Sequence, residues 1–151
     1  MGLLTPELKA AIGRSLPPVK AEVTRRDIRK YAVSTEQRLP RFLRGDEAPP
    51  LFLFGLFLEV LPRDEMLEDG RQPDSGLVPD LPLKRVMAGG TEAKIFRGIY
   101  PGDVLVLKQT LVDLYEKQGS QGPLIFAIVE NRIETEAGEP VMTERVTRIA
   151  R

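Results

Sequence analysis

Side chains that can move a proton or attack a substrate are few in this sequence. The segment 31–42 (YAVSTEQRLPRF) has the outline of an active-site loop, with a helix end, a polar turn and a proline, yet it contains neither aspartate nor histidine. The whole chain lacks histidine and cysteine. General acid–base catalysis needs a group that gains and loses a proton near neutral pH, and thiolate chemistry needs cysteine. We therefore expect no disulfide and no metal site.

Carboxylates are the remaining candidates for chemistry. Glu36 lies inside the loop-like segment, where a solvated turn residue and a substitute acid–base group are both consistent with the sequence. Asp46 and Glu47 stand just before an apolar run. Asp103 ends a Tyr-Pro-Gly-Asp turn, where an aspartate normally accepts hydrogen bonds from nearby backbone N–H groups. A structural role is therefore expected for Asp103.

Composition excludes several classes of protein. The 151 residues suit one domain, predicted over 1–151. Charges balance at 22 basic and 22 acidic residues, which argues against a nucleic-acid binder because such a protein needs a basic excess. The N-terminal sequence lacks the basic and apolar regions of a secretory signal. The longest apolar run has 11 residues, whereas a membrane span needs about 20. A soluble cytoplasmic protein is expected.

The first half of the chain predicts helices. Thr5 and Thr24 are good N-cap residues at the start of two short helices. The segment 51–61 (LFLFGLFLEVL) is long for a strand and apolar on all sides, which predicts a helix buried on all sides. Gly55 in its middle costs about 1 kcal/mol of helix propensity. A strand or a ligand is therefore expected to approach the backbone at Gly55 closely.

The second half predicts an antiparallel sheet. Asp64–Pro82 is rich in Asp, Gly and Pro and is expected to be an exposed loop. The strand-like runs after it are rich in Val, Ile, Leu and Thr and are separated by turn sequences; they cover 86–97, 104–117, 124–134 and 141–149. Helices first and a meander afterwards make the predicted fold class α+β, with helix packed on one sheet face.

Three short motifs follow one another in the second half of the chain: AGGT at 88–91, YPGD at 100–103 and YEKQGSQGPLIF at 115–126. In their order and spacing they resemble motifs of the MaoC-like hydratase and dehydratase family, in its N-terminal, fatty-acid-synthase-type dehydratase form. Tyr-Pro-Gly-Asp at 100–103 resembles the family's Gly-Asp turn, and residues 115–126 (YEKQGSQGPLIF) resemble its Glu-Lys-x-Gly-x-x-Gly-x-x-x-Phe hairpin. Residues 88–91 (AGGT) stand where the family often has His-Gly-Gly-Gln. The resemblance covers nearly the whole chain and implies a single hot-dog fold, an antiparallel sheet wrapped around a central buried helix.

The segment 31–42 aligns without a gap to the family's catalytic motif Tyr-Ala-x-x-Ser-Gly-Asp-x-Asn-Pro-x-His. In this alignment Gln37 stands at the Asp position, Phe42 at the His position and Glu36 at the Gly position. In the family, Asp and His act on the water that adds to the enoyl thioester double bond. An amide and a phenyl ring cannot replace them, because neither exchanges a proton near neutral pH. The resemblance thus implies a loop without catalytic residues, with Glu36 as an outside candidate.

Inert hot-dog domains of this family pair with an active one, which supplies the Asp and His. The resemblance therefore implies an acyl-pocket-forming subunit of an (R)-specific enoyl-thioester hydratase or 3-hydroxyacyl dehydratase. The implied partner is a catalytic hot-dog chain in a heterodimer or heterotetramer, or a second copy in a homodimer. No bound cofactor is expected; coenzyme A or phosphopantetheine carries the substrate. The residues expected to bind the acyl group are Phe52, Phe54, Gly55, Phe57, Gly89 and Gly90, and those expected at the phosphate rim are Lys84, Arg85, Lys94 and Arg97.

Two alternatives remain open from the sequence. Some hot-dog thioesterases use a carboxylate instead of histidine, so an independent acyl-CoA thioesterase with Glu36, Asp46 or Glu47 as the working group is one of them. The other is a module that binds an acyl-CoA or a lipid and catalyses nothing.

Overall fold

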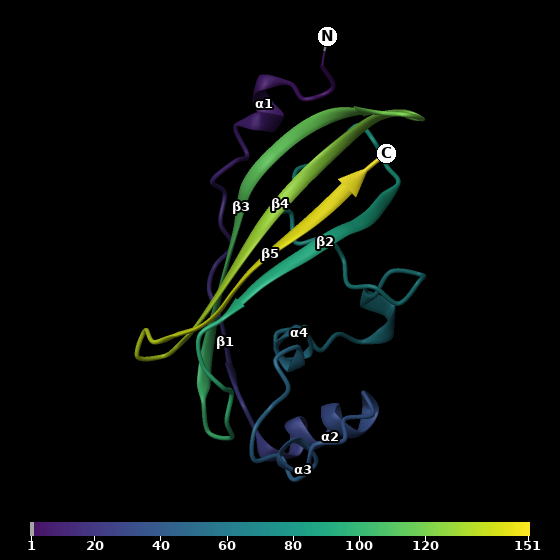
Figure 1. Ribbon diagram of the computed structural model, residues 1–151. Helices are drawn as coiled ribbons and strands as arrows, with labels where there is room; N and C mark the ends of the chain where they lie inside the picture. Colours follow the sequence, from purple (N-terminus) through teal and green to yellow (C-terminus); the bar gives the residue numbers. More distant parts are fainter. Residues whose placement is uncertain (1) are drawn as a thin grey trace.

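A single five-stranded antiparallel sheet dominates the computed structural model, which describes residues 2–151 (Figure 1). Met1, the first residue of the predicted domain, lies outside the described residues. The strand order is β1-β3-β4-β5-β2. The strands are β1 (Val19–Glu22), β2 (Val86–Ile95), β3 (Val104–Gly119), β4 (Gly122–Thr135) and β5 (Pro140–Ala150). The predicted α+β class and the four predicted strand runs are confirmed.

Short helices gather at the two ends of the sheet. Figure 1 shows α2, α3 and α4 grouped at one end, with α1 near the other end beside β3. The helical segments are α1 (Pro6–Lys9), α2 (Arg25–Ser34), α3 (Pro40–Leu43), α4 (Phe52–Leu56) and the 3₁₀ turn η1 (Arg63–Glu65). The Thr5 and Thr24 side chains accept hydrogen bonds from the backbone N–H groups of Leu8 and Asp27. Both predicted N-caps are therefore confirmed.

The apolar segment 51–61 differs from its prediction. It is helical only over Phe52–Leu56, and its side chains divide between the core and the surface. Phe52 is 3% exposed, whereas Phe54 is 77% exposed and Val60 is 98% exposed. A helix of five residues makes little more than one turn, so it can bury only one side. The helix predicted over eleven residues and buried on all sides is therefore wrong in its length and in its burial.

Two apolar clusters lie on one face of the sheet, which we call the inner face. The first cluster lies under α2–α4 and joins Ile28, Phe52 and Leu53 to strand residues that include Leu105, Leu107, Ile133 and Met142. The second lies toward α1 and joins Leu4, Ala11 and Leu77 to strand residues that include Leu111, Leu114, Ile125, Ala127 and Val129. Leu77 is 3% exposed, so the end of the predicted loop Asp64–Pro82 packs on the sheet instead of hanging free.

The two edges of the sheet are unequal. β1 has four residues, whereas β2 has ten, all of them exposed. An edge strand offers unpaired backbone N–H and C=O groups to any strand that approaches it. The long β2 edge is thus the larger free pairing surface.

None of the helices described over residues 2–151 combines the length and the apolar character that a membrane span requires.

The opposite, outer face carries charges, of which Glu130 on β4 is the most buried. Its carboxylate accepts hydrogen bonds from Arg132 Nε at 2.8 Å and Arg145 Nε at 3.0 Å. Burial disfavours the charged form of Glu130, but these two hydrogen bonds outweigh it and hold the pKa below its usual value. The ionised form of Glu130 therefore stabilises the folded state.

Substitution Glu130→Gln is expected to reduce stability at neutral pH and to change its acid dependence. Because the folded-state pKa lies below the unfolded value of about 4.3, the contribution of Glu130 is fully present above that value. It is lost as pH falls through the folded-state pKa. The difference in unfolding free energy between the wild type and the variant, about 1–2 kcal/mol at pH 7, should shrink below about pH 4. Urea unfolding from pH 3 to 7 measures it, and a constant difference would contradict the assignment.

Candidate active-site loop

The loop aligned with the catalytic motif joins α2 to α3. Thr35 ends α2, and its hydroxyl donates to the Tyr31 carbonyl oxygen at 2.8 Å. Glu36 follows with φ of 54°, the only positive φ at a non-glycine residue within 2–151. The left-handed region favours glycine, which is the residue the catalytic motif has at this position. The chain therefore keeps the backbone shape of the loop, although Glu36 replaces the glycine.

The two positions expected to hold proton-transferring groups have different environments. Gln37 is half-buried, its backbone N–H bonds to the Ala32 carbonyl at 2.9 Å, and its amide Nε2 donates to Thr35 Oγ1 at 3.3 Å. Phe42 on α3 is 7% exposed and therefore belongs to the packed interior. Neither side chain can exchange a proton near neutral pH. The exposed Glu36 side chain has no hydrogen-bond or ion-pair partner within residues 2–151, so no contact orients it for catalysis.

Asp46 and Glu47 are engaged in ion pairs on the surface. Asp46 Oδ1 lies 2.6 Å from Arg25 Nη1, and Oδ2 lies 2.8 Å from Arg44 Nε. Hydrogen bonds from Arg25 and Arg44 lower the pKa of Asp46, which makes it a poorer base. Glu47 lies 3.2 Å from Arg41. Both carboxylates are therefore engaged by arginine side chains.

Asp103 fastens the turn that precedes β3. It accepts a hydrogen bond from the Tyr100 backbone N–H at 2.8 Å and two from the Arg97 guanidinium at 3.2 Å each. The Asp103 and Arg97 side chains are both largely buried. The predicted structural role of Asp103 agrees with these contacts. Arg97, predicted at a phosphate rim, is instead the ion-pair partner of this turn.

The other predicted rim residues do not form one cluster. Lys84 Nζ forms an ion pair with Asp80 Oδ1 at 2.6 Å. The backbone N–H groups of Arg85 and Arg151 each donate a hydrogen bond to the other residue's carbonyl oxygen. Lys94 Nζ lies 5.1 Å from the centre of the Phe96 ring. Ten residues of largely extended chain separate Lys84 from Lys94, about 30 Å at strand rise. The four residues therefore do not gather at one point, and their predicted contact with phosphates stays a prediction.

The predicted acyl-pocket residues are also dispersed. Phe52 lies in the first apolar cluster and packs edge to face on Tyr31, with the two ring centres 5.7 Å apart. Phe57 is half-buried against the same cluster. Phe54 points to solvent. A Cβ built on Gly55 would meet no atom within 4 Å. The close approach expected at Gly55 is absent from this chain, because α4 ends one residue later and Gly55 lies on its exposed side.

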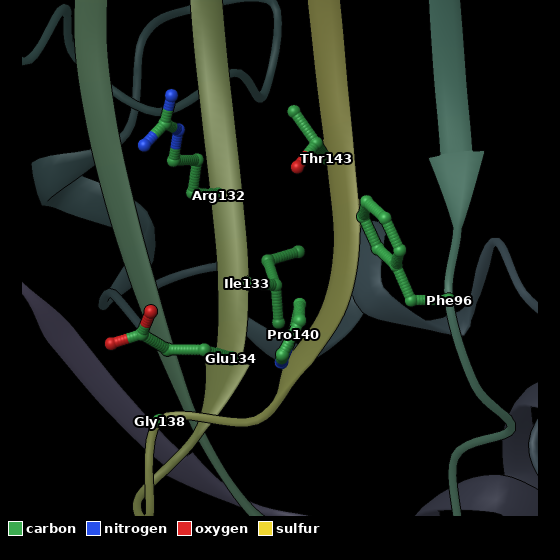
Figure 2. A pocket seen from close by; sticks show the side chains of 7 residues that line it. All are labelled: Phe96, Arg132, Ile133, Glu134, Gly138, Pro140 and Thr143. Carbon is green, nitrogen blue, oxygen red and sulfur yellow. The ribbon is translucent and has the colours of Figure 1, made fainter.

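Two hollows flank Phe96, the residue after β2. The first, of about 240 Å³, lies at the β4–β5 turn, and Figure 2 shows its lining of Phe96, Arg132, Ile133, Glu134, Gly138, Pro140 and Thr143. The second, of about 260 Å³, is lined by Glu47, Ala48, Pro50, Ile95, Phe96, Arg97, Gly98 and Ile99. Sequence reasoning did not identify Phe96; its signal is an aromatic residue directly after an edge strand. No group of three acidic side chains within 2–151 is placed to hold a metal ion.

Comparison with known proteins decides the family. The profile of the FAS1-like dehydratase domain region matches residues 10–144. The chain belongs to this MaoC-like hot-dog dehydratase family. A UPF0336 protein of Saccharopolyspora erythraea is 32% identical to this chain in an alignment that covers 93% of this chain and 88% of the relative. The predicted family is therefore confirmed.

Solved structures confirm the hot-dog fold. A chain of the ChsH1-ChsH2 complex from Mycobacterium tuberculosis superposes with a TM-score of 0.71 and 19% identity, over 95% of this chain and 86% of that one. A chain of the C-terminally truncated HadBC (3R-hydroxyacyl-ACP dehydratase) complex from the same organism superposes with a TM-score of 0.61 and 18% identity. The superposition covers 93% of this chain and 97% of that one. At these identities the likeness establishes the fold alone.

The glycine pair of this hot-dog chain forms a β-bulge in β2. The register with β5 shifts between Ala88 and Gly90. A Cβ on Gly89 would lie 2.7 Å from the Thr147 side chain, and Gly90 has φ of 136°. Both glycines are thus required by strand geometry. Their predicted contact with a substrate stays a prediction.

Proposed function

We propose that this hot-dog chain is the non-catalytic, acyl-pocket-forming subunit of a heteromeric (R)-specific enoyl-thioester hydratase or 3-hydroxyacyl dehydratase. The supporting observation is the pair Gln37 and Phe42, an amide and a buried ring at the positions where the family's motif has Asp and His. The left-handed backbone at Glu36 supports the alignment on which this pair is identified. The substrate is carried as a thioester of coenzyme A or of phosphopantetheine on an acyl carrier protein.

A partner with its own Asp and His is part of this proposal. A homodimer would only repeat the amide and the ring, so it would contain no acid–base pair at either loop. The two similar structures come from the ChsH1-ChsH2 and HadBC complexes, which supports a second hot-dog chain for this protein. The long exposed β2 edge offers that chain ten residues of backbone for pairing. The partner supplies proton transfer, and this chain completes the wall of the acyl pocket.

The test compares the chain alone with the chain purified together with a hot-dog protein from a neighbouring gene that carries Asp-x-Asn-Pro-x-His. Hydration of crotonyl-CoA is expected from the complex only. Gln37→Ala in this chain should leave kcat within about twofold. Asp→Asn in the partner's motif should lower kcat by about 10²–10⁴, the usual size of an acid–base contribution.

Three results would contradict the proposal. Turnover by this chain alone would make it an independent enzyme. A large loss of kcat in Gln37→Ala would place this loop in the catalytic machinery. Calorimetric binding of acyl-CoA to this chain alone, without association with the neighbouring hot-dog protein, would indicate a binding module instead.

A further inference from the structure

A row of polar side chains crosses the inner face of the sheet between the two apolar clusters. Gln109 on β3, Asn131 on β4 and Glu144 on β5 are register partners on neighbouring strands. Gln109 Nε2 donates to Asn131 Oδ1 at 2.9 Å, and Asn131 Nδ2 donates to Glu144 Oε2 at 2.9 Å. All three residues are half-buried. A continuous hydrogen-bonded row therefore leads from the middle of the sheet toward the β2 edge.

On β3 and β4 the row stands between apolar inward positions. On β3 the inward positions around Gln109 are Leu107 and Leu111, and on β4 those around Asn131 are Val129 and Ile133, all four buried. Strand alternation puts the three polar side chains on the inner face, and the strand register puts them next to one another. A half-buried polar row costs desolvation free energy unless its members find partners. Three polar side chains side by side on neighbouring strands indicate a local requirement for polarity.

The last member of the row has an unused acceptor. Glu144 Oε2 is engaged by Asn131, whereas its other oxygen, Oε1, has no hydrogen bond or ion pair within residues 2–151. Its register partner on the edge strand is Ala93, which is exposed, and the next inward residue of that strand is Thr91. The side chain directly beside Glu144 on β2 is thus a small one. A carboxylate oriented by an amide and with one oxygen unengaged is suited to accept a hydrogen bond from a ligand.

The ends of the inner face are covered, and the polar row is not part of either cover. α2–α4 cover the first cluster, and α1 with Leu77 and its neighbours covers the second. Glu144 on β5 lies nearer to the β2 edge, where the proposed partner pairs, than Asn131 on β4 and Gln109 on β3 do. Neither of the two hollows described above is lined by a residue of the row, so an acyl pocket over the row would have to be completed by the partner chain.

We propose that Glu144, positioned by Asn131 and Gln109, binds a hydrogen-bond donor on the acyl group, so that the complex prefers enoyl thioesters bearing a hydroxyl group over purely hydrocarbon ones. This inference rests on the proposed pocket-forming function of the chain. The carboxylate accepts the hydrogen bond and no covalent step is involved. Sites built to bind a substrate hydroxyl discriminate strongly against analogues that lack it, because the buried polar group is then left unpaired.

The test uses the reconstituted complex and two substrates of equal chain length, trans-2-decenoyl-CoA and 10-hydroxy-trans-2-decenoyl-CoA. The wild type should favour the hydroxylated substrate by about tenfold or more in kcat/KM, as a charge-assisted hydrogen bond allows. Glu144→Leu should abolish this preference by lowering kcat/KM for the hydroxylated substrate toward that for the plain substrate. Glu144→Gln keeps an acceptor for Asn131 but loses the charge, so it should give an intermediate preference. Glu22→Leu, at an exposed glutamate of β1, is the matched control and should leave the preference unchanged.

The outcomes separate the two proposals. Equal use of both substrates by an active complex, or a preference that survives Glu144→Leu, would overturn the role of Glu144 and leave the subunit function intact. A proportional loss on both substrates in Glu144→Leu would assign Glu144 a structural role only. No hydration of either substrate or of crotonyl-CoA by the complex would overturn the subunit function and, with it, this inference.

Discussion

Lysine placed on the free β2 edge is expected to abolish association with the catalytic partner. Val86 and Ile95 stand at the two ends of β2 and are 63% and 52% exposed. In a complex built on this edge, Val86→Lys and Ile95→Lys together would carry two charges into the interface without partners, which is costly. Charged side chains are also a natural device against pairing at sheet edges. The dissociation constant should rise by at least about 100-fold, which corresponds to about 2.7 kcal/mol.

The experiment measures association by calorimetry and native mass spectrometry, and crotonyl-CoA hydration at a fixed chain concentration. Because both side chains are exposed, the double variant should melt within a few degrees of the wild type. Val60→Lys introduces one such charge at a position that is 98% exposed and lies in a loop, and this variant should bind the partner as the wild type does. Undiminished association of the double variant would place the interface on another surface.

Substitution Leu105→Ala, which truncates a core side chain, is expected to destabilise the folded chain more than Glu130→Gln does. Leu105 is fully buried on β3 in the cluster that joins the sheet to Ile28 and Phe52. Leu105→Ala removes buried methyl groups and leaves a cavity that the surrounding strands cannot fill, a change that costs about 2–5 kcal/mol. For a domain of this size the melting temperature should fall by roughly 10 °C.

Differential scanning calorimetry and urea unfolding measure this effect on the isolated chain. Val60→Ala serves as the control because Val60 is almost wholly exposed, and it should change the free energy of unfolding by less than about 0.5 kcal/mol. A cost for Leu105→Ala as small as that of the control would mean that the first cluster is loosely packed. The attachment of the helices to the sheet would then depend on other contacts.

Local signals in the sequence were enough for the strands and caps. The strand runs carry β-branched residues between turns, and the turn predicted at 119–122 is present, although the strands continue up to Gly119 and from Gly122. Thr24 and Asp27 form a cap that depends only on residues three positions apart. Such features form through neighbours in the chain, so composition and spacing predict them well.

The lack of a proton-transferring side chain at the two motif positions was also determined by the sequence alone. Gln37 and Phe42 cannot become an acid and a base in any fold, because their chemistry does not depend on their surroundings. The motif resemblance indicated the family, which the profile match confirms.

Only the tertiary structure decided which side chains meet. Apolar composition over 51–61 predicted a long buried helix, but the fold turns only Phe52 and Leu53 into the core and leaves Phe54 outside. The sequence alone indicated a free cation at Arg97. In the fold, the turn at Tyr100 places Asp103 within hydrogen-bond distance of the Arg97 guanidinium.

The row of Gln109, Asn131 and Glu144 likewise exists only through strand register, since no spacing along the chain relates residues 13 and 22 positions apart. Its members lie on three different strands, and their neighbours in sequence give no indication of contact. Pairing between distant segments is set by the whole sheet and its covering helices. The composition of any one segment therefore cannot predict it.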